Sequence, residues 1–121
     1  MVPNVVKGSG FRGLCNYLLV GRKDAVVIGG NMVGRTAVEL TREFGMLRRL
    51  RPGPVKPVMH HTLSFADGED PGNGMIGEIA ESYIRRMGLE SHQWVAVVHR
   101  DKAHVHVHLA INRIGLDVSW W

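Results

Sequence analysis

Apolar residues recur along the chain with two different periods, and these periods predict where its helices and strands lie. Recurrence every three or four residues is typical of a helix with one buried face, whereas strict alternation is typical of a half-buried strand. The helical period predicts three helices, over residues 11–19, 37–50 and 75–87. Alternation and short apolar runs predict strands over residues 25–28, 59–66 and 93–99, and a further strand that begins at His104.

The residues that flank these helices include common start and stop signals. Ser9 is placed to cap the first helix, and Thr36 with Glu39 has the spacing of a capping box at the second. The prolines of residues 52–54 should end the second helix, and Gly88 should end the third. These signals support three separate helices rather than one long helical region.

The last two strands lie close enough in the sequence to form a hairpin, with residues 100–103 as its loop. Helices interspersed with strands, two of which form a hairpin, predict an α+β fold with a mostly antiparallel central sheet. We expect the helices to pack on one face of this sheet and to leave the histidine-bearing face open. Residues 1–121 should form one domain, since a chain of this length buries a single modest core.

The stretch from His99 to Arg113 contains four of the seven histidines of the chain. Because alternate residues of a strand share a face, His104, His106 and His108 should project together from the last strand. With a four-residue loop, His99 would lie opposite His104 and on the same face. Several neutral imidazoles on one face suit a divalent cation, whereas the alternative is a solvent-facing strand that merely alternates.

Several other polar residues are candidate members of a site here. Asp101 could orient an imidazole or accept a proton, or it could simply close the hairpin turn. Asn112 falls on the histidine face, and Arg113 could contact a phosphate or cap the strand. Of the two tyrosines, Tyr83 belongs to the apolar stripe of the third helix. Tyr17 is not needed for the apolar stripe of the first helix, because other residues already supply it. Water, a serine or Tyr17 could serve as a nucleophile, and spacing alone does not choose among them.

Charge, apolar runs and cysteine content narrow the class of protein. Residues 1–56 carry ten Lys and Arg against three Asp and Glu, whereas residues 57–121 carry five against eight. A basic half beside a histidine cluster predicts a polyanionic partner, and the phosphates of nucleic acid are the first candidate.

The sequence has no apolar run of membrane-spanning length and no signal-peptide pattern. Because Cys15 is the only cysteine, we expect a cytoplasmic protein. The terminal pair Trp120-Trp121 predicts a fragment of a longer protein, because nothing follows to cover these two side chains.

Three motifs taken together resemble those of plasmid mobilisation relaxases, within the HUH endonuclease group. One set of residues resembles the third motif of that family, namely His99-x-Asp101, His106-x-His108 and Asn112-Arg113. The second is resembled by residues 60–65 (HHTLSF) with Gly68-Glu69, and the first by residues 11–18 (FRGLCNYL). The motifs occur in the order of the family and at similar spacings, so the resemblance spans nearly the whole chain.

The resemblance implies an HUH-type relaxase fold and a metal-dependent nickase that cuts and rejoins one DNA strand at a plasmid transfer origin. Tyr17 would attack the scissile phosphodiester, form a 5′-phosphotyrosyl link and leave a free 3′-hydroxyl. Asp101 would help to deprotonate Tyr17 or would orient a ligand. His99, His106 and His108 would hold Mg²⁺ or Mn²⁺, with Zn²⁺ as a third candidate.

The same resemblance implies the partners of the protein. Ser64 would help to position DNA, and Asn112 and Arg113 would contact it. The substrate would be single-stranded DNA at the origin of transfer, in the cytoplasm of a bacterium and away from the membrane. Accessory relaxosome proteins and a coupling protein would assist in conjugative transfer or mobilisation.

One residue departs from the family pattern, and other enzyme classes stay open. His104 stands where relaxases often have a polar residue other than histidine, so it competes with His99 for the first ligand position. We favour His99 because it opens the His-x-Asp element. Residues 104–111 (HVHVHLAI) also resemble the signature of histidine-triad nucleotide hydrolases and transferases, in which His106 would be the nucleophile. Another HUH enzyme, such as a replication initiator or a transposase, would share the relaxase chemistry.

Overall fold

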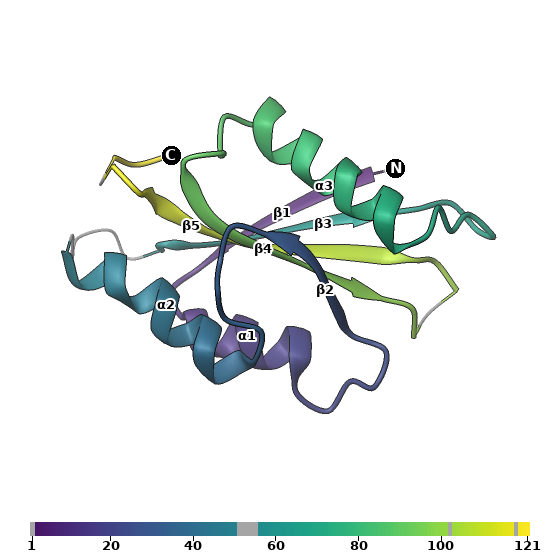
Figure 1. Cartoon of the computed structure of the whole chain (residues 1–121), viewed down its shortest axis with the longest axis horizontal. Helices are drawn as coiled ribbons and strands as arrows, with labels where there is room; N and C mark the ends of the chain where they lie inside the picture. Colours follow the sequence, from purple (N-terminus) through teal and green to yellow (C-terminus); the bar gives the residue numbers. More distant parts are fainter. Residues whose placement is uncertain (1, 51–55, 102, 118) are drawn as a thin grey trace.

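The computed structural model describes residues 2–50, 56–101, 103–117 and 119–121, and it has the expected α+β fold (Figure 1). Within these ranges, three helices and five strands follow one another. They are β1 (Val2–Gly8), α1 (Phe11–Leu19), β2 (Val26–Gly30), α2 (Ala37–Leu50), β3 (Val58–Ser64), α3 (Asn73–Arg86), β4 (His92–His99) and β5 (His106–Gly115). The five strands form one sheet in the order β1-β3-β5-β4-β2, and every neighbouring pair is antiparallel. The predicted antiparallel sheet is therefore confirmed.

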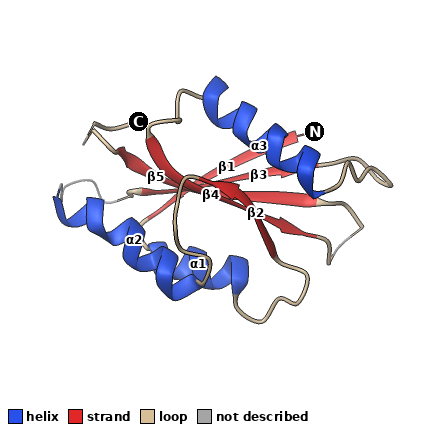
Figure 2. Ribbon diagram, viewed as in Figure 1, coloured by secondary structure: helices blue, strands red, loops and turns tan. Residues whose placement is uncertain are grey.

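Helices cover both faces of the sheet, not one face as predicted (Figure 2). Helix α3 packs on the face formed by Val107, Leu109 and Ile111 of β5. Helices α1 and α2 pack on the opposite face, which is also the face of the histidines, over part of its length. The physical reason is that β4 is buried on both faces, and a strand that is apolar on both faces needs a cover on each.

Most of the local signals in the sequence are confirmed. Helices α1 and α2 have the predicted bounds, and the capping box forms because the backbone N–H of Glu39 donates to Thr36 Oγ1 while Glu39 accepts from the N–H of Thr36. Gly88 follows the C-cap residue Met87 of α3 and has φ +72°, the left-handed geometry expected where a helix ends. The predicted cap at Ser9 is wrong, because Gly10 occupies the cap position and no side chain bonds there. The predicted stop at residues 52–54 lies outside the described residues.

Strand β1 and the register of the β4–β5 hairpin were not predicted. Among the described strands, β1 lies at the edge of the sheet and pairs with β3, and its half-exposed valines hide the alternation of a strand. In the hairpin, His99 pairs with His106 and not with His104, because β5 begins two residues later than expected. The face is unchanged by this shift, since side chains repeat every two residues along a strand. The sequence thus predicts the correct face of the sheet for His99, but the wrong residue opposite it on β5.

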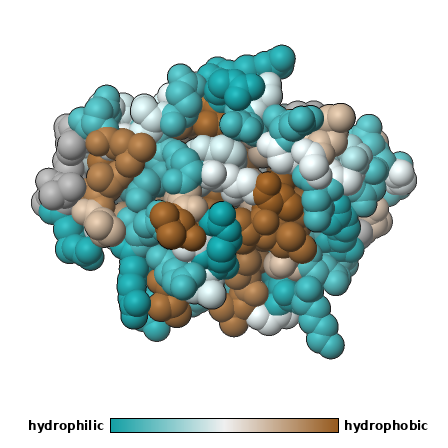
Figure 3. Space-filling model, viewed as in Figure 1, coloured by the Kyte–Doolittle hydropathy of each residue, from teal (hydrophilic) through white to brown (hydrophobic). Residues whose placement is uncertain are grey.

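The face of the molecule seen in Figure 3 is mainly hydrophilic, with separate hydrophobic patches. Exposed apolar side chains include Val33, Val38 and Met46 of the β2–α2 region. Isolated patches of this kind are normal on globular domains. Within the described residues, no helix combines the length and the apolar character needed to cross a bilayer.

We predict that a buried histidine makes folding stability fall as the solution becomes mildly acidic. His61 is completely buried on the α3 face, where its Nδ1 bonds to Tyr83 Oη at 2.6 Å. Burial, with a smaller effect of His60, lowers the pKa of His61 to about 4. Between pH 6.5 and 4, His61 therefore binds a proton in the unfolded chain but stays neutral in the folded protein. Folding stability is lost as the pH falls through this range.

The free energy of unfolding should drop by about 2 kcal/mol between pH 7 and 5 through His61 alone. Urea unfolding of the wild type and of His61→Gln at several pH values measures this contribution, since glutamine does not titrate. The pH dependence of the variant should be shallower by that amount. Parallel curves for the two proteins would show that His61 does not carry the effect.

Candidate active site

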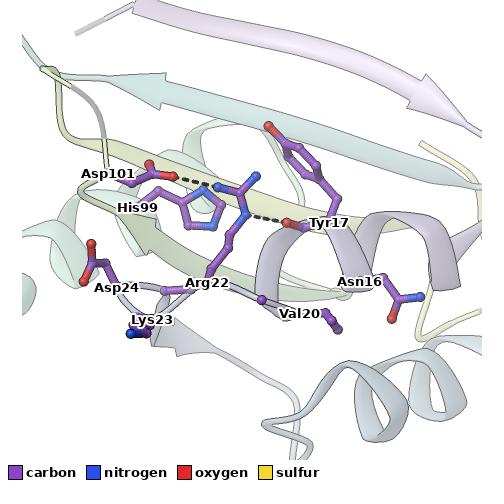
Figure 4. Close-up of a pocket in the computed structure, with 10 residues that line it drawn as sticks. Asn16, Tyr17, Val20, Arg22, Lys23, Asp24, His99 and Asp101 are labelled. Carbon is purple, nitrogen blue, oxygen red and sulfur yellow. Dashed lines mark hydrogen bonds and ion pairs between the residues drawn. The ribbon is translucent and has the colours of Figure 1, made fainter.

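Three histidines, His99, His106 and His108, line a cavity of about 290 Å³ on the face of the sheet that α1 and α2 cover in part. Its walls come from five elements and two loops. The lining residues are Asn4, Tyr17, Arg22, Thr62, Ser64, His99, Asp101, His106 and His108. A second cavity of about 450 Å³ adjoins it and shares Tyr17, Arg22, His99 and Asp101 (Figure 4). The fold therefore brings together most of the residues singled out from the sequence.

The three predicted metal ligands each have one ring nitrogen engaged by a protein group. His99 Nε2 donates to the carbonyl of Leu18 at 2.8 Å, and His106 Nδ1 lies 2.9 Å from Ser64 Oγ. His108 Nδ1 lies 2.8 Å from Nε2 of His60. A carbonyl can only accept, so neutral His99 carries its proton on Nε2 and has a lone pair on Nδ1.

His60 is a member of this site that the sequence analysis did not single out. It lies on β3, on the same face as Ser64, and its ring centre is 5.0 Å from that of His108. The signal was available, because alternation in strand 59–66 already placed His60 and Ser64 together. If His60 Nε2 accepts from His108 Nδ1, the remaining nitrogen of His108 is left with a lone pair.

Burial keeps several of these imidazoles neutral. It lowers the pKa of His60 and of His99, and it lowers the pKa of His108 to about 3, with further lowering by the neighbouring histidines. A metal ion binds the neutral form of imidazole, so these rings are in the binding form at neutral pH.

The donor set fits a divalent cation in its chemistry. Nδ1 of His99 and Nε2 of His106 and His108 make no hydrogen bond to any described residue, and the opposite nitrogen of each ring is held by the protein. Such outer hydrogen bonds are a regular feature of histidine ligands. As the side chains stand, no three His, Cys, Asp or Glu residues in the described ranges converge tightly enough for a metal. Binding would therefore require the rings to rotate toward one another.

Tyr17 lies beside the histidines and is half-exposed, at 52%. Its ring centre is 6.0 Å from that of His60, 6.1 Å from His108 and 6.4 Å from His99. The buried stripe of α1 is formed by Phe11, Cys15 and Leu18, so Tyr17 points away from the core. Tyr83, by contrast, packs on the opposite face against His61.

Asp101 lies in the same wall and pairs with a residue that the sequence analysis missed. Its Oδ2 accepts from Arg22 Nη1 at 2.9 Å, while Arg22 Nε donates to the carbonyl of Tyr17 at 2.7 Å (Figure 4). Arg22 lies in the loop after α1, outside all three motifs, so no pattern in the sequence pointed to it. Asp101 is close to the site but makes its described contacts with Arg22.

His104 lies outside the two cavities. It is exposed in the loop between β4 and β5, where its Nδ1 lies 3.4 Å from Asp67 Oδ1. The expectation that His104 projects from a strand with His106 and His108 is therefore wrong. In the choice between His99 and His104, the geometry favours His99, because only His99 borders the cavity.

Asn112 and Arg113, the other predicted DNA contacts, lie outside the lining of the cavity. Asn112 is 0% exposed, and its amide bonds to Gln93 and to the backbone of Phe44 beneath α2, so no DNA can reach it in this structure. Arg113 donates to the carbonyls of Lys56 and Trp121. These bonds match the strand-capping alternative, and a DNA contact of Arg113 stays a prediction.

The comparisons with known proteins agree with the motifs. A family model described as "Relaxase: MobA/VirD2-like, nuclease domain" matches residues 16–121. Protein MobA of Acidithiobacillus ferrooxidans is 33% identical over 57 residues, which is 47% of this chain and 14% of that protein. Two TraI proteins of Escherichia coli are each 36% identical over 55 residues, which is 46% of this chain and 7% or 8% of those proteins. The matched segment thus spans a small part of these relatives. No solved structure matches.

Proposed function

The chain belongs to the MobA/VirD2-like relaxase family, and on that premise we propose that residues 1–121 form a catalytic domain that nicks and rejoins one DNA strand at a plasmid transfer origin. The observation that carries the proposal is the position of Tyr17, which lines the same cavity as His99 and His108 and whose ring centre lies 6.4 Å and 6.1 Å from theirs. A tyrosine beside a histidine cluster supplies a nucleophile and a set of ligands for phosphodiester chemistry.

In the proposed reaction, Tyr17 Oη forms a bond to the scissile phosphorus. The bond from phosphorus to the 3′-oxygen of the preceding nucleotide breaks, which leaves a 5′-phosphotyrosyl link and a free 3′-hydroxyl. The phenol proton passes to Asp101 or to water, and the 3′-oxygen gains a proton as it leaves. One phosphodiester is exchanged for another, so the reverse attack rejoins the strand without ATP.

A divalent cation is part of this proposal. His99, His106 and His108 would hold Mg²⁺, Mn²⁺ or Zn²⁺, and the cation would offset negative charge on the phosphate. The side chain of Ser64 orients His106 through their 2.9 Å contact and faces the cavity, where it is proposed to contact the DNA strand.

The proposed substrate is single-stranded DNA at an origin of transfer, because the cavity is open and the N-terminal half is rich in Lys and Arg. The working partners of the protein are proposed to be accessory relaxosome proteins and a coupling protein. The proposed location is the cytoplasm of a bacterium.

A denaturing gel tests the proposed function. The protein is incubated with single-stranded oligonucleotides from its own origin region and Mn²⁺, and then denatured. A covalent protein–DNA adduct supports the relaxase, and a scrambled oligonucleotide serves as the control. Nucleotide hydrolysis in the presence of chelator and without any adduct would instead favour the histidine-triad chemistry.

Replacing His60 should weaken metal binding although His60 is not a proposed ligand. His60→Gln removes the ring that fixes the orientation of His108, and the loss of such an outer partner typically costs ~10–100-fold in metal affinity. Titration calorimetry with Mn²⁺ measures the dissociation constant. His104→Ala is the matched control, since it removes a histidine outside the cavity and should leave the constant unchanged. Equal affinity of His60→Gln and wild type would contradict the prediction.

A further inference from the structure

Arg22 makes three contacts at once at the wall shared by the two cavities. Its Nε donates to the carbonyl of Tyr17 at 2.7 Å, and its Nη1 donates to Asp101 at 2.9 Å. Its guanidinium carbon lies 4.7 Å from the centre of the Tyr17 ring. Figure 4 shows the guanidinium between Tyr17 and Asp101. One side chain therefore connects the proposed nucleophile with the acidic residue of the site.

Each contact answers a local physical need. The last carbonyls of a helix have no partner within the helix, and Arg22 Nε bonds the one at Tyr17. A half-exposed tyrosine ring has few packing partners, and a cation over its face restricts its orientation. The carboxylate of Asp101 is held by the ion pair, at an end of the sheet where loops and not strands surround it.

A lysine cannot make these contacts together. The guanidinium is planar, carries donors in a fixed fork and stacks on aromatic rings, whereas an ammonium is a single point charge. The chain reaches this geometry through Gly21, whose φ of +74° turns the backbone directly after α1. The loop thus aims a planar group, and not only a positive charge, at Tyr17.

We propose that Arg22 is a positioning residue, which holds the ring of Tyr17 and the carboxylate of Asp101 in one mutual orientation for attack on the phosphate. This inference rests on the proposed function for its effect on the reaction. Its structural part, the ordering of the Tyr17 ring, does not depend on DNA. Loss of Arg22 should therefore slow the chemical step much more than it weakens DNA binding.

The kinetic test measures adduct formation at saturating oligonucleotide and Mn²⁺. Arg22→Ala should slow the reaction by ~100-fold, the cost typical of a misplaced reacting group, with little change in DNA affinity. Arg22→Lys should leave most of the loss in place. Added guanidinium salt should restore part of the rate of Arg22→Ala, because the 450 Å³ cavity gives it access to the vacated position. Arg85→Ala removes an exposed charge from α3, on the opposite face of the sheet, and is the control.

A second measurement needs no activity. With 3-fluorotyrosine at both tyrosines, the ¹⁹F resonance of Tyr17 should shift and sharpen in Arg22→Ala and Arg22→Lys, while that of Tyr83 stays in place. An unchanged Tyr17 resonance would overturn the inference, and so would wild-type adduct rates in both variants. A loss confined to DNA affinity would overturn it too, because Arg22 would then be only a phosphate contact. Failure of the wild type to form any adduct would refute the proposed function, and the resonance would still decide the role of Arg22.

Discussion

Tyr17→Phe will form no covalent adduct with single-stranded DNA, and its rate of strand cleavage will fall by ~1,000-fold or more, as expected when a nucleophile is removed. The substitution deletes one hydroxyl and keeps the ring. The contact of Arg22 with the ring and its bond to the Tyr17 carbonyl can therefore remain. The fold should be unaffected, because the side chain is half-exposed and outside the core.

Tyr83→Phe is the matched control, because the chain has two tyrosines and the change is the same. Tyr83 Oη bonds to His61 on the opposite face of the sheet, so its loss should lower stability by about 1 kcal/mol and leave adduct formation intact. Denaturing gels and urea unfolding read the two effects separately. An adduct that survives Tyr17→Phe would assign the nucleophile to another residue.

Removal of divalent cations will stop adduct formation, and added Mn²⁺ will restore it. The same cation should stabilise the folded protein, by about 2.7 kcal/mol at a concentration 100 times its dissociation constant. The stabilisation arises because the folded chain gathers His99, His106 and His108 around one cavity, whereas the unfolded chain does not. Thermal unfolding with and without Mn²⁺ measures it.

His106→Ala should lose both the activity and the Mn²⁺-dependent stabilisation, whereas His104→Ala should keep both. The comparison is informative because the two histidines are two residues apart, yet only His106 lines the cavity. Full activity of the wild type in chelator would contradict the metal-dependent proposal. If that activity were nucleotide hydrolysis and disappeared in His106→Ala, the histidine-triad interpretation would take its place.

Much of the secondary structure follows from local patterns, and the exceptions have physical causes. Helices α1 and α2 have the predicted bounds, because an amphipathic stripe and helix-end signals are local properties. Strand β1 was not predicted, because an edge strand that is exposed on much of its surface does not need alternating apolar and polar residues. The hairpin register was wrong by two residues, since a loop length is set by what its residues contact. Arg100 pairs with Asp70 and His104 lies near Asp67, so these residues belong to the loop and not to the strand.

The sequence by itself determined which side chains share a face of the sheet. The period of two is a geometric property of the extended backbone, so His106 and His108 share a face of β5. The pairing register of β3 with β5 then puts Ser64 on the same face. For the same reason Asn112 lies on that face, and the motif pattern pointed to Tyr17 as their companion.

Only the tertiary structure decided which part of that face is open. Helix α2 covers Asn112 and leaves His108 beside a cavity, although both residues belong to one strand and one face. The tertiary structure also brought His60 against His108. It placed Arg22 beside Asp101, although these two residues are 79 positions apart in the sequence. Periodicity specifies a direction for each side chain, whereas cover and contact depend on how distant segments pack, and that information is not local to any motif.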